Sequence, residues 1–511
     1  MTRLWSLSVV ALITAALALL PVRAQEEKAA SKGAEKKEKK ESEGEKPVVS
    51  HHEVRVGDGV LKYTATVGLM PLNDSEGKLE AHMSYVAYTA DDPGDRARRP
   101  LMFSFNGGPG SSSVWLHLGA LGPRRVAMPD EPTIPPPPFR LVDNGESWLD
   151  KTDLVFIDPV GTGYSRAARP ELNKKFHGLK GDIASVGEFI RIYLTRAERW
   201  TSPLYLVGES YGTTRAAGLA GHLADEGIAF NGIILISTVL DFQTLLFGRT
   251  NEVPYVLYVP SYTATAWYHK KLPDDLQRAG LRKALDEAER WAEDDYRTAL
   301  ARGDRISDEE RAATLKQLAR FTGLSKRFLD LNNLRVEDSQ FARELLRDAR
   351  KTVGRFDSRY LGIVENAGSS SPEFDPSLAA VRPAYTATFN QYVRAELGYK
   401  SDAPYYILGG LVGRWDWGQS GEGYPETGGS LREAMAKNPH MKVLVASGYF
   451  DLATPYASAD YTLAHMKLDP ELRRNVRVTT YEAGHMMYLH GPSLVKLKQD
   501  ASRFLDESDG P

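Results

Sequence analysis

The chain has 511 residues, of which 42% are hydrophobic, and its net charge at neutral pH is −3. This length suffices for one large domain with an insertion, or for two or three smaller domains. The charges are mixed along most of the chain, so they give no indication of nucleic acid or of an acidic or membrane-surface partner.

The first residues have the features of a secretory signal peptide. Arg3 precedes an apolar run from Leu4 to Leu20, and Val22 and Ala24 occupy the −3 and −1 positions of a cut after Ala24. The apolar run nearly reaches the length that spans a bilayer, so an uncleaved membrane anchor is the alternative. We expect residues 1–24 to be removed, which predicts a secreted or periplasmic protein with no stable membrane insertion after cleavage.

The chain contains no cysteine. An exported protein without disulfides has to be stabilised by burial alone, and this favours a bacterial periplasm or exterior over a eukaryotic secretory route.

Residues 25–47 are almost all Glu, Lys, Ala, Ser and Gly. Because such a segment has little apolar surface to bury, it predicts a disordered charged linker.

Folded structure is predicted from residue 48 onward. Residues 54–70 and 82–89 alternate polar and apolar side chains, with a turn at Gly57-Asp-Gly59, and indicate antiparallel strands at a sheet edge. Later apolar runs are more continuous and alternate with helical segments, which is typical of a mostly parallel sheet covered by helices on both faces. These runs are residues 100–105, 153–158, 204–207, 232–237, 442–447 and 476–481.

Residues 241–400 have a different pattern, in which strand-like runs are nearly absent. We interpret them as a mainly helical insertion over the carboxyl edge of the sheet, where the active sites of such sheets lie, and therefore as a candidate lid. A separate helical domain is the alternative. The insertion would divide the core into residues 48–240 and 401–511. Its amphipathic helices are predicted at residues 273–301, 308–321 and 338–353.

Ser210 is the candidate nucleophile. It lies in Gly208-Glu-Ser-Tyr-Gly212, between an apolar strand and a helix predicted from Ala216 to Leu223. The pattern G-x-S-x-G often occurs by chance, but a strand before it and a helix after it favour a sharp turn that exposes the serine hydroxyl. The amide of Tyr211 would lie at the helix N-terminus, where N–H groups attract developing negative charge.

His485 and Asp451 are the candidate base and its orienting acid. His485 follows the strand ending near Tyr481, and Asp451 follows the strand ending at Ser447. A carboxylate there can accept the imidazole N–H and fix its tautomer. Asp416 and Asp460 are rivals by residue type, but neither directly follows a strand. The chain order Ser, Asp, His is that of α/β-hydrolase sheets with a nucleophile elbow.

A glycine-rich loop supplies the candidate oxyanion hole. Asn106-Gly-Gly-Pro-Gly110 follows an early strand of the sheet, where this fold takes its second oxyanion donor. We assign the amides of Gly108 and Tyr211 to the hole, in which each donor contributes about 3 kcal/mol. A plain Gly-Pro turn between strand and helix is the alternative.

The motifs taken together resemble the serine carboxypeptidase family. The resemblance implies an α/β-hydrolase fold with a helical insertion, peptide substrates, no cofactor, a triad of Ser210, Asp451 and His485, and an oxyanion hole at Gly108 and Tyr211. It also implies that Asn106 and Glu209 hold the C-terminal carboxylate of the substrate. The motifs are Asn106-Gly-Gly-Pro-Gly-Ser-Ser-Ser113, Leu121-Gly-Pro123, Phe156-Ile-Asp-Pro159, Gly163-Tyr-Ser165, Gly208-Glu-Ser-Tyr-Gly212, Gly448-Tyr-Phe-Asp451 and Gly484-His-Met486.

Glu209 can bind another carboxylate only if one of the two acids is protonated, because two ionised acids in contact repel each other. A structural alternative is that Glu209 is an acid at the start of a helix, where the helix dipole favours it.

The chain also departs from the family pattern. Ala120 stands where a second acid is usual, and Ser111 stands in place of a cysteine. Arg124 and Arg125 could supply charge for the substrate's C-terminus instead.

Three functions therefore remain open. The first is a secreted serine carboxypeptidase, and the second is an esterase or acyltransferase with the same triad, which the missing acid at Ala120 favours. The third is a non-catalytic binding protein on a hydrolase sheet. The sequence has no H-E-x-x-H pair and no cysteine cluster, so it predicts no metal site. It leaves the oligomeric state open.

Overall fold

The computed structural model describes residues 46–410, 412–418 and 423–508. The predicted signal peptide and all but the last two residues of the predicted linker lie outside the described residues. Within these ranges, no helix combines the length and the apolar character needed to cross a membrane.

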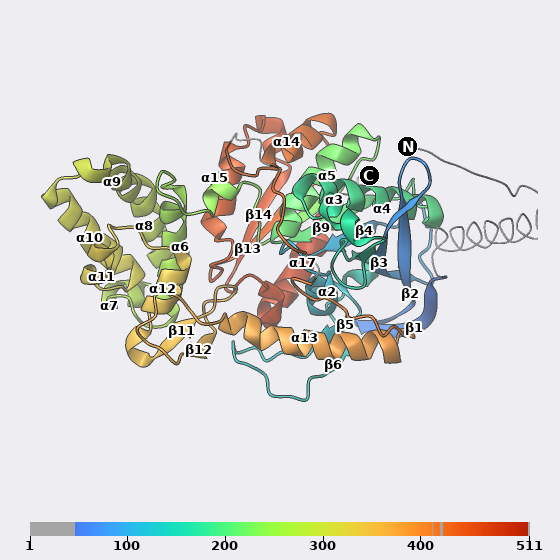
Figure 1. Ribbon diagram of the computed structural model, residues 1–511, viewed down its shortest axis with the longest axis horizontal. Coiled ribbons are helices and arrows are strands. Elements are labelled where there is room, and N and C mark those ends of the chain that lie inside the picture. The colour runs from blue at the N-terminus through green and yellow to red at the C-terminus, as the bar shows by residue number, and fades with distance from the viewer. Residues whose placement is uncertain (1–45, 411, 419–422, 509–511) are drawn as a thin grey trace, which may run out of the picture.

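A ten-stranded mixed sheet forms the centre of the molecule (Figure 1). The strand order is β1-β2-β3-β7-β4-β9-β10-β13-β14, with the short strand β8 paired to β3. The β1–β2, β2–β3 and β3–β7 pairs are antiparallel, and every neighbouring pair from β7 to β14 is parallel. The predicted mostly parallel sheet with an antiparallel edge is confirmed.

The strands of this sheet are β1 (Val48–Val56), β2 (Gly59–Asn73), β3 (Leu79–Ala90), β4 (Leu101–Phe105), β7 (Asp153–Ile157), β8 (Arg166–Ala167), β9 (Leu204–Glu209), β10 (Gly232–Ile236), β13 (Lys442–Gly448) and β14 (Val476–Tyr481). Two small antiparallel pairs are β5 (Arg124–Val126) with β6 (Leu141–Asp143), and β11 (Lys351–Val353) with β12 (Leu361–Ile363).

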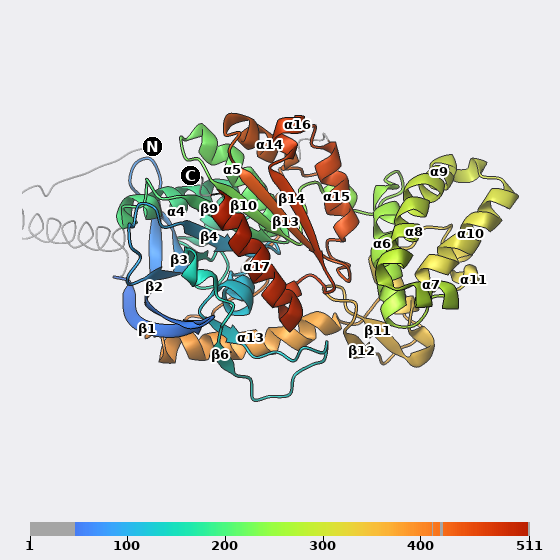
Figure 2. The ribbon, with the colours of Figure 1, turned by 180° about the vertical axis from the view of Figure 1, so that it is seen from behind.

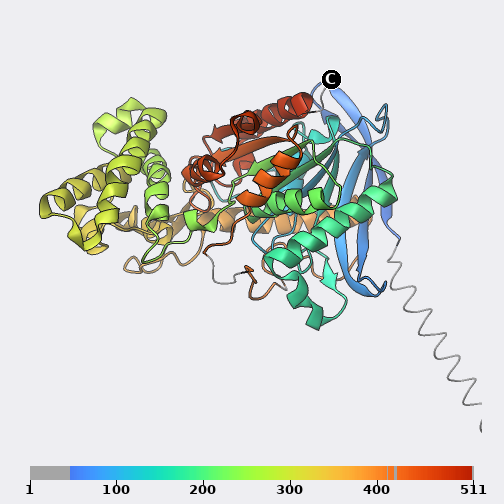
Figure 3. The same ribbon diagram turned by 90° about the horizontal axis from the view of Figure 1, so that it is seen from above.

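The central strands of the sheet are buried on both faces, and each face belongs to its own hydrophobic cluster. In β9, Tyr205 and Val207 belong to one cluster, while Leu204 and Leu206 belong to the other. Because side chains alternate across a strand and both sides are covered, the central strands read as unbroken apolar runs. Figures 2 and 3 show α17 on one face of the sheet, and Figure 3 shows α4 and α5 on the other.

The helices of the sheet domain are α2 (Val114–Leu116), α3 (Asn173–Phe176), α4 (Leu179–Ala197), α5 (Tyr211–Asp225), α13 (Pro376–Ala395), α14 (Gly428–Lys437), α15 (Tyr456–His465), α16 (Pro470–Arg473) and α17 (Gly491–Ser508). The remaining helices are α6 (Val253–Tyr268), α7 (Asp274–Ala279), α8 (Leu281–Trp291), α9 (Arg297–Arg302), α10 (Asp308–Thr322), α11 (Lys326–Leu331) and α12 (Asp338–Glu344).

Helices α6 to α12 form a group beside the sheet with a hydrophobic cluster of its own (Figures 1 and 3). This cluster includes Leu452, which directly follows Asp451, so the helical group packs on a loop at the end of β13. Helix α13 instead contributes Tyr385 and Phe389 to the cluster on one sheet face. The division of the chain at residues 240 and 400 remains a prediction.

Two details of the predicted insertion are wrong. The helix predicted over residues 338–353 ends at Glu344, and Lys351–Val353 forms strand β11. Arg350 adopts a left-handed backbone with φ 54°, and the β-branched Thr352 and Val353 pair with β12. The predicted helix over residues 273–301 is divided at Gly280, whose φ of 89° cannot continue a helix.

Candidate functional site

Ser210 occupies a strained turn between β9 and α5. Its φ of 61° and ψ of −132° lie outside the regions that non-glycine residues usually adopt, which costs about 1–3 kcal/mol. A Cβ at Gly208 would overlap the carbonyl of Gly212, so only glycine allows strand and helix to approach this closely. The Ser210 amide donates to the Ile236 carbonyl at 2.9 Å and ties the turn to β10. The sharp turn expected at this serine is present.

His485 and Asp451 form a buried hydrogen-bonded pair. The distance from His485 Nδ1 to Asp451 Oδ2 is 2.7 Å, and both side chains are almost wholly buried. The carboxylate is held in place by donors from its own loop, the amides of Ala453 and Thr454 and the Thr454 hydroxyl, at 2.7, 3.0 and 2.8 Å. Asp451 can therefore orient the imidazole as the sequence predicts.

Burial acts to lower the pKa of His485, but Asp451 and Glu209 raise it, and the net direction is upward. The backbone around this histidine is fixed as well. Its amide donates to the Phe356 carbonyl at 2.6 Å, and its carbonyl accepts the Ser237 hydroxyl at 2.6 Å. The ring also packs against the Phe356 ring, with centroids 4.8 Å apart. These contacts leave the imidazole one orientation.

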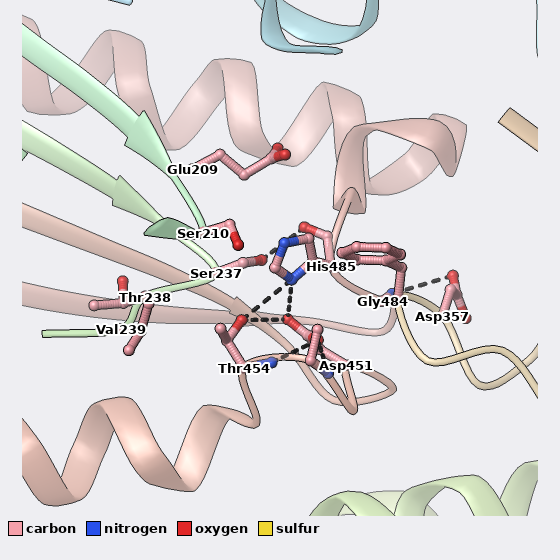
Figure 4. Close-up of polar contacts among 12 residues, drawn as sticks. Glu209, Ser210, Ser237, Thr238, Val239, Asp357, Asp451, Thr454, Gly484 and His485 are labelled. Atoms are coloured by element: carbon pink, nitrogen blue, oxygen red, sulfur yellow. Dashed lines mark hydrogen bonds and ion pairs between the residues drawn. The ribbon is translucent and has the colours of Figure 1, made fainter. Parts of the chain in front are cut away.

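Ser210 lies on the side of the imidazole opposite Asp451 (Figure 4). The serine hydroxyl points toward the ring, while Nδ1 faces the carboxylate. Ser210 and His485 line the same cavity. Side chains separated by 275 positions in the sequence thus line one cavity at the edge where the parallel strands end.

The glycine-rich loop after β4 passes over the N-terminus of α5. A Cβ at Gly107 would clash with the amide nitrogen of Tyr211, and Gly108 has a φ of 103°. Neither the Gly108 nor the Tyr211 amide is a donor among the backbone hydrogen bonds of the described chain. Both amides are therefore available to a substrate oxygen in this part of the cavity.

A buried ion pair that we did not predict holds this loop against α5. The Arg215 guanidinium donates to Asp182 Oδ2 at 2.8 Å and to the Asn106 carbonyl at 2.7 Å, and the Tyr211 hydroxyl donates to the same Asp182 oxygen at 3.0 Å. Arg215 and Asp182 have side-chain exposures of 1% and 2%. The sequence feature that could have indicated this ion pair is an arginine within a helix of otherwise mostly small and apolar residues.

Asn106 and Glu209 are joined by a hydrogen bond of 2.8 Å from Asn106 Nδ2 to Glu209 Oε1. Burial raises the pKa of Glu209 to about 7, and His485, Tyr488 and Asn106 offset this rise in part. The other carboxyl oxygen, Oε2, is buried and has no hydrogen bond of ordinary geometry in the described chain. A carboxyl group in this state can share a proton with an incoming carboxylate below neutral pH.

The region where the family has its second acid is filled by apolar and aromatic groups. Ala120 is fully buried, and a Cβ on the adjacent Gly119 would meet the ring of Tyr488 and the hydroxyl of Tyr385. Neither Arg124 nor Arg125 lines the cavity, so the suggestion that they replace the missing acid gains no support from its lining. Arg124 instead pairs with Asp143 and Glu396 near the surface.

The cavity is mainly apolar, and residues 241–400 contribute part of its wall. Arg355 also lines it, a residue that our reading of the sequence missed because nothing local distinguishes it from other surface arginines. Among the described residues, no three His, Asp or Glu side chains are grouped so as to hold a metal ion. The apolar lining residues include Trp115, Val239, Phe242, Leu245, Phe356 and Leu378.

Comparisons with known proteins agree with this geometry. The family described as "Serine carboxypeptidase" matches residues 58–488. Serine carboxypeptidase-like 45 of Arabidopsis thaliana is 26% identical over 227 residues, which are 39% of this chain and 44% of that protein. Pheromone-processing carboxypeptidase KEX1 of Colletotrichum graminicola is 29% identical over 215 residues, 42% of this chain and 31% of that protein. The matches thus span less than half the length of these relatives.

A solved structure supports the fold. The prohormone-processing carboxypeptidase KEX1(delta)p of Saccharomyces cerevisiae superposes with a TM-score of 0.56 at 17% identity, covering 87% of this chain and 91% of the other. The predicted α/β-hydrolase fold is confirmed.

Proposed function

The chain belongs to the serine carboxypeptidase family, and we propose that it hydrolyses the C-terminal peptide bond of peptides through an acyl-enzyme on Ser210. The observation that carries this proposal is the convergence of Ser210, His485 and the paired Asn106 and Glu209 in one cavity. A hydrolytic group and a carboxylate-recognising group that lie side by side fit an exopeptidase.

The first half of the reaction transfers the acyl group to the enzyme. Ser210 Oγ attacks the peptide carbonyl while His485 takes its proton, and Asp451 stabilises the resulting imidazolium. The amides of Gly108 and Tyr211 donate to the developing oxyanion. His485 then returns the proton to the leaving amine, and the C-terminal amino acid departs.

The second half of the reaction frees the enzyme. A water molecule, deprotonated by His485, attacks the acyl carbon, and the same amides again hold the oxyanion. The proton then returns to Ser210 as the acid product leaves. Because the same three residues serve both steps, loss of any one of them should lower kcat by several orders of magnitude.

Asn106 and Glu209 would hold the terminal carboxylate of the substrate. At a pKa of about 7, Glu209 is mostly protonated in mild acid, so it donates to the carboxylate instead of repelling it. Ionisation above that pH restores the repulsion. We therefore expect KM for peptides with a free C-terminus to rise as the pH increases through neutrality.

A blocked dipeptide with a free C-terminus and the same dipeptide as its C-terminal amide test the proposal directly. We expect kcat/KM at pH 5.5 to be at least about 100-fold higher for the free acid, because one buried charged hydrogen bond contributes about 1.5–3 kcal/mol and the site offers two such partners. Equal hydrolysis of the two compounds would contradict terminal-carboxylate recognition. Ser210→Ala is the control for hydrolysis by contaminants.

An esterase or acyltransferase with the same triad is the second candidate. Ala120 favours it, because the second acid of the family's usual carboxylate site is missing. This candidate predicts that neutral esters are cleaved as fast as peptides with a free C-terminus. It also predicts no preference for the free acid over the amide in the dipeptide comparison, which therefore separates the two candidates.

The predicted signal peptide extends the proposal to location. We propose that residues 1–24 direct export and that the mature protein begins at Gln25, in the periplasm or outside the cell. Fractionation of the producing cells and N-terminal sequencing of the exported protein test this. A protein that keeps Met1 and sediments with membranes would instead indicate an uncleaved anchor.

A further inference from the structure

Arg355 is the one arginine or lysine among the described residues that line the cavity of Ser210. Two backbone hydrogen bonds, one at Arg355 and one at the next residue, fix its position. The Arg355 carbonyl accepts the Leu452 amide at 3.0 Å, and the next carbonyl, that of Phe356, accepts the His485 amide. The segment is therefore bonded to the loops that carry both Asp451 and His485, although it comes from the region between the two halves of the sheet.

The side chain of Arg355 keeps donors that a ligand can reach. Its Nε donates to Asp338 Oδ2 at 2.9 Å, and this contact orients the guanidinium. Among the described residues, the side chain makes no hydrogen bond other than this one from Nε. Its Cζ lies 5.9 Å from the centroid of the Phe356 ring, and the side chain is 51% exposed, so the two terminal nitrogens are open to a ligand. A guanidinium held at Nε presents its other N–H groups in a fixed fork, which matches the two oxygens of a carboxylate.

This cation is on the other side of the site from Glu209. In Figure 4, Glu209 and Asp451 lie on opposite sides of the His485 ring. The backbone of Arg355 is bonded beside Asp451, at Leu452. A substrate whose terminal carboxylate is held at Glu209 would therefore present another part of itself to Arg355.

We propose that Arg355 forms a second carboxylate-binding subsite, which selects peptides with an acidic side chain next to the scissile bond. The inference rests on the proposed function for the orientation of the peptide. Apolar groups form most of the cavity lining, and no other described lining residue is an arginine or lysine that would compete for the carboxylate. Asp338 offsets part of the charge of Arg355, so the preference for an acidic over a neutral side chain should be moderate.

The test compares blocked dipeptides that differ only by Glu or Gln, placed in turn at each residue beside the scissile bond. For the protein with its natural sequence we expect kcat/KM to be about tenfold higher for Glu than for Gln at one of the two positions, from one charged hydrogen-bond pair. Arg355→Gln should reduce this ratio to about one, and Asp338→Asn should raise it. Arg327→Gln, an exposed arginine on α11, should leave the ratio unchanged.

The same peptides are also titrated calorimetrically against Ser210→Ala, with and without Arg355→Gln, so that binding is read without hydrolysis. A preference for Glu in Kd that disappears with Arg355→Gln supports the subsite, even if no peptide is cleaved and the proposed function fails. A Glu-to-Gln ratio that Arg355→Gln leaves unchanged overturns the inference. So does a preference for Gln, or no binding of either peptide, in the protein that retains Arg355.

Discussion

The protonation state of Glu209 should make the affinity for substrate depend on pH. Its neighbours Asn106 and His485 stabilise the ionised form, but burial dominates and raises its pKa to about 7. Protonated Glu209 donates to a terminal carboxylate, whereas the ionised form repels it. Binding of peptides with a free C-terminus should therefore be strong below pH 7 and weaken above it.

Replacement of Glu209 by Gln should remove this dependence. The amide stays neutral, so KM between pH 5 and 9 should become flat. Steady-state pH profiles on a blocked dipeptide check this effect. An unchanged rise of KM above pH 7 in the Gln variant would assign that titration to another group.

The contact of α5 with the glycine-rich loop depends on Arg215. Its guanidinium donates to both the Asn106 carbonyl and Asp182 Oδ2, and so fixes the loop that carries the Gly108 amide. Arg215→Met should lower kcat by about 100-fold, as expected when an oxyanion donor moves out of place, with little change in KM. It should also destabilise the fold by about 3–5 kcal/mol, since Asp182 is left buried and unpaired.

The double variant Arg215→Met with Asp182→Asn separates these two effects. Removing the buried charge should restore most of the free energy of unfolding, because the uncompensated carboxylate is gone. The loss in kcat should persist, because nothing then holds the Asn106 carbonyl. Denaturant unfolding and single-turnover kinetics measure the two quantities. Recovery of kcat together with stability would mean that Arg215 acts on the fold alone.

The elements that the sequence predicts well are those with a local signal. The central strands are apolar on both faces, and Ser210 and Asp451 each follow such a strand, whereas His485 follows the more exposed edge strand β14. The sequence therefore indicates both the sheet and the side chains at its carboxyl edge. The end of α12 was missed because pairing of β11 with β12 overrides the helical pattern of that segment.

The contacts that the sequence does not predict are long-range ones. Arg215 meets Asp182 from a different helix, and Arg355 reaches the cavity only because its backbone bonds to loops about 100 and 130 positions later. Neither arginine belongs to a motif. The pKa of Glu209 also depends on burial by several elements, so the sequence motif indicates its position but not its protonation.

Across the whole molecule, the helical group α6–α12 packs on the loop of Asp451 through Leu452. Leu452→Ala should destabilise the protein by about 2–5 kcal/mol and also lower kcat, because the loop that holds Asp451 is loosened. Leu318→Ala removes a side chain from the same cluster but far along the chain from the triad loops. It should destabilise comparably and leave kcat within about twofold.

Both leucine variants are measured by urea unfolding and by kcat at a temperature well below their unfolding. Equal effects on kcat would show that the helical group acts on the catalytic loops only through overall stability. A selective loss in Leu452→Ala would show that the packing of this group maintains the geometry of the site.

The most direct measurement is covalent labelling with a serine-directed phosphonofluoridate, followed by mass spectrometry of the digested protein. We expect one adduct per chain, located on Ser210, and labelling that is slowed by several orders of magnitude in His485→Ala. Ser210→Ala should take up no label. Stoichiometric labelling of Ser210→Ala, or equal labelling rates with and without His485, would contradict the proposed catalytic site.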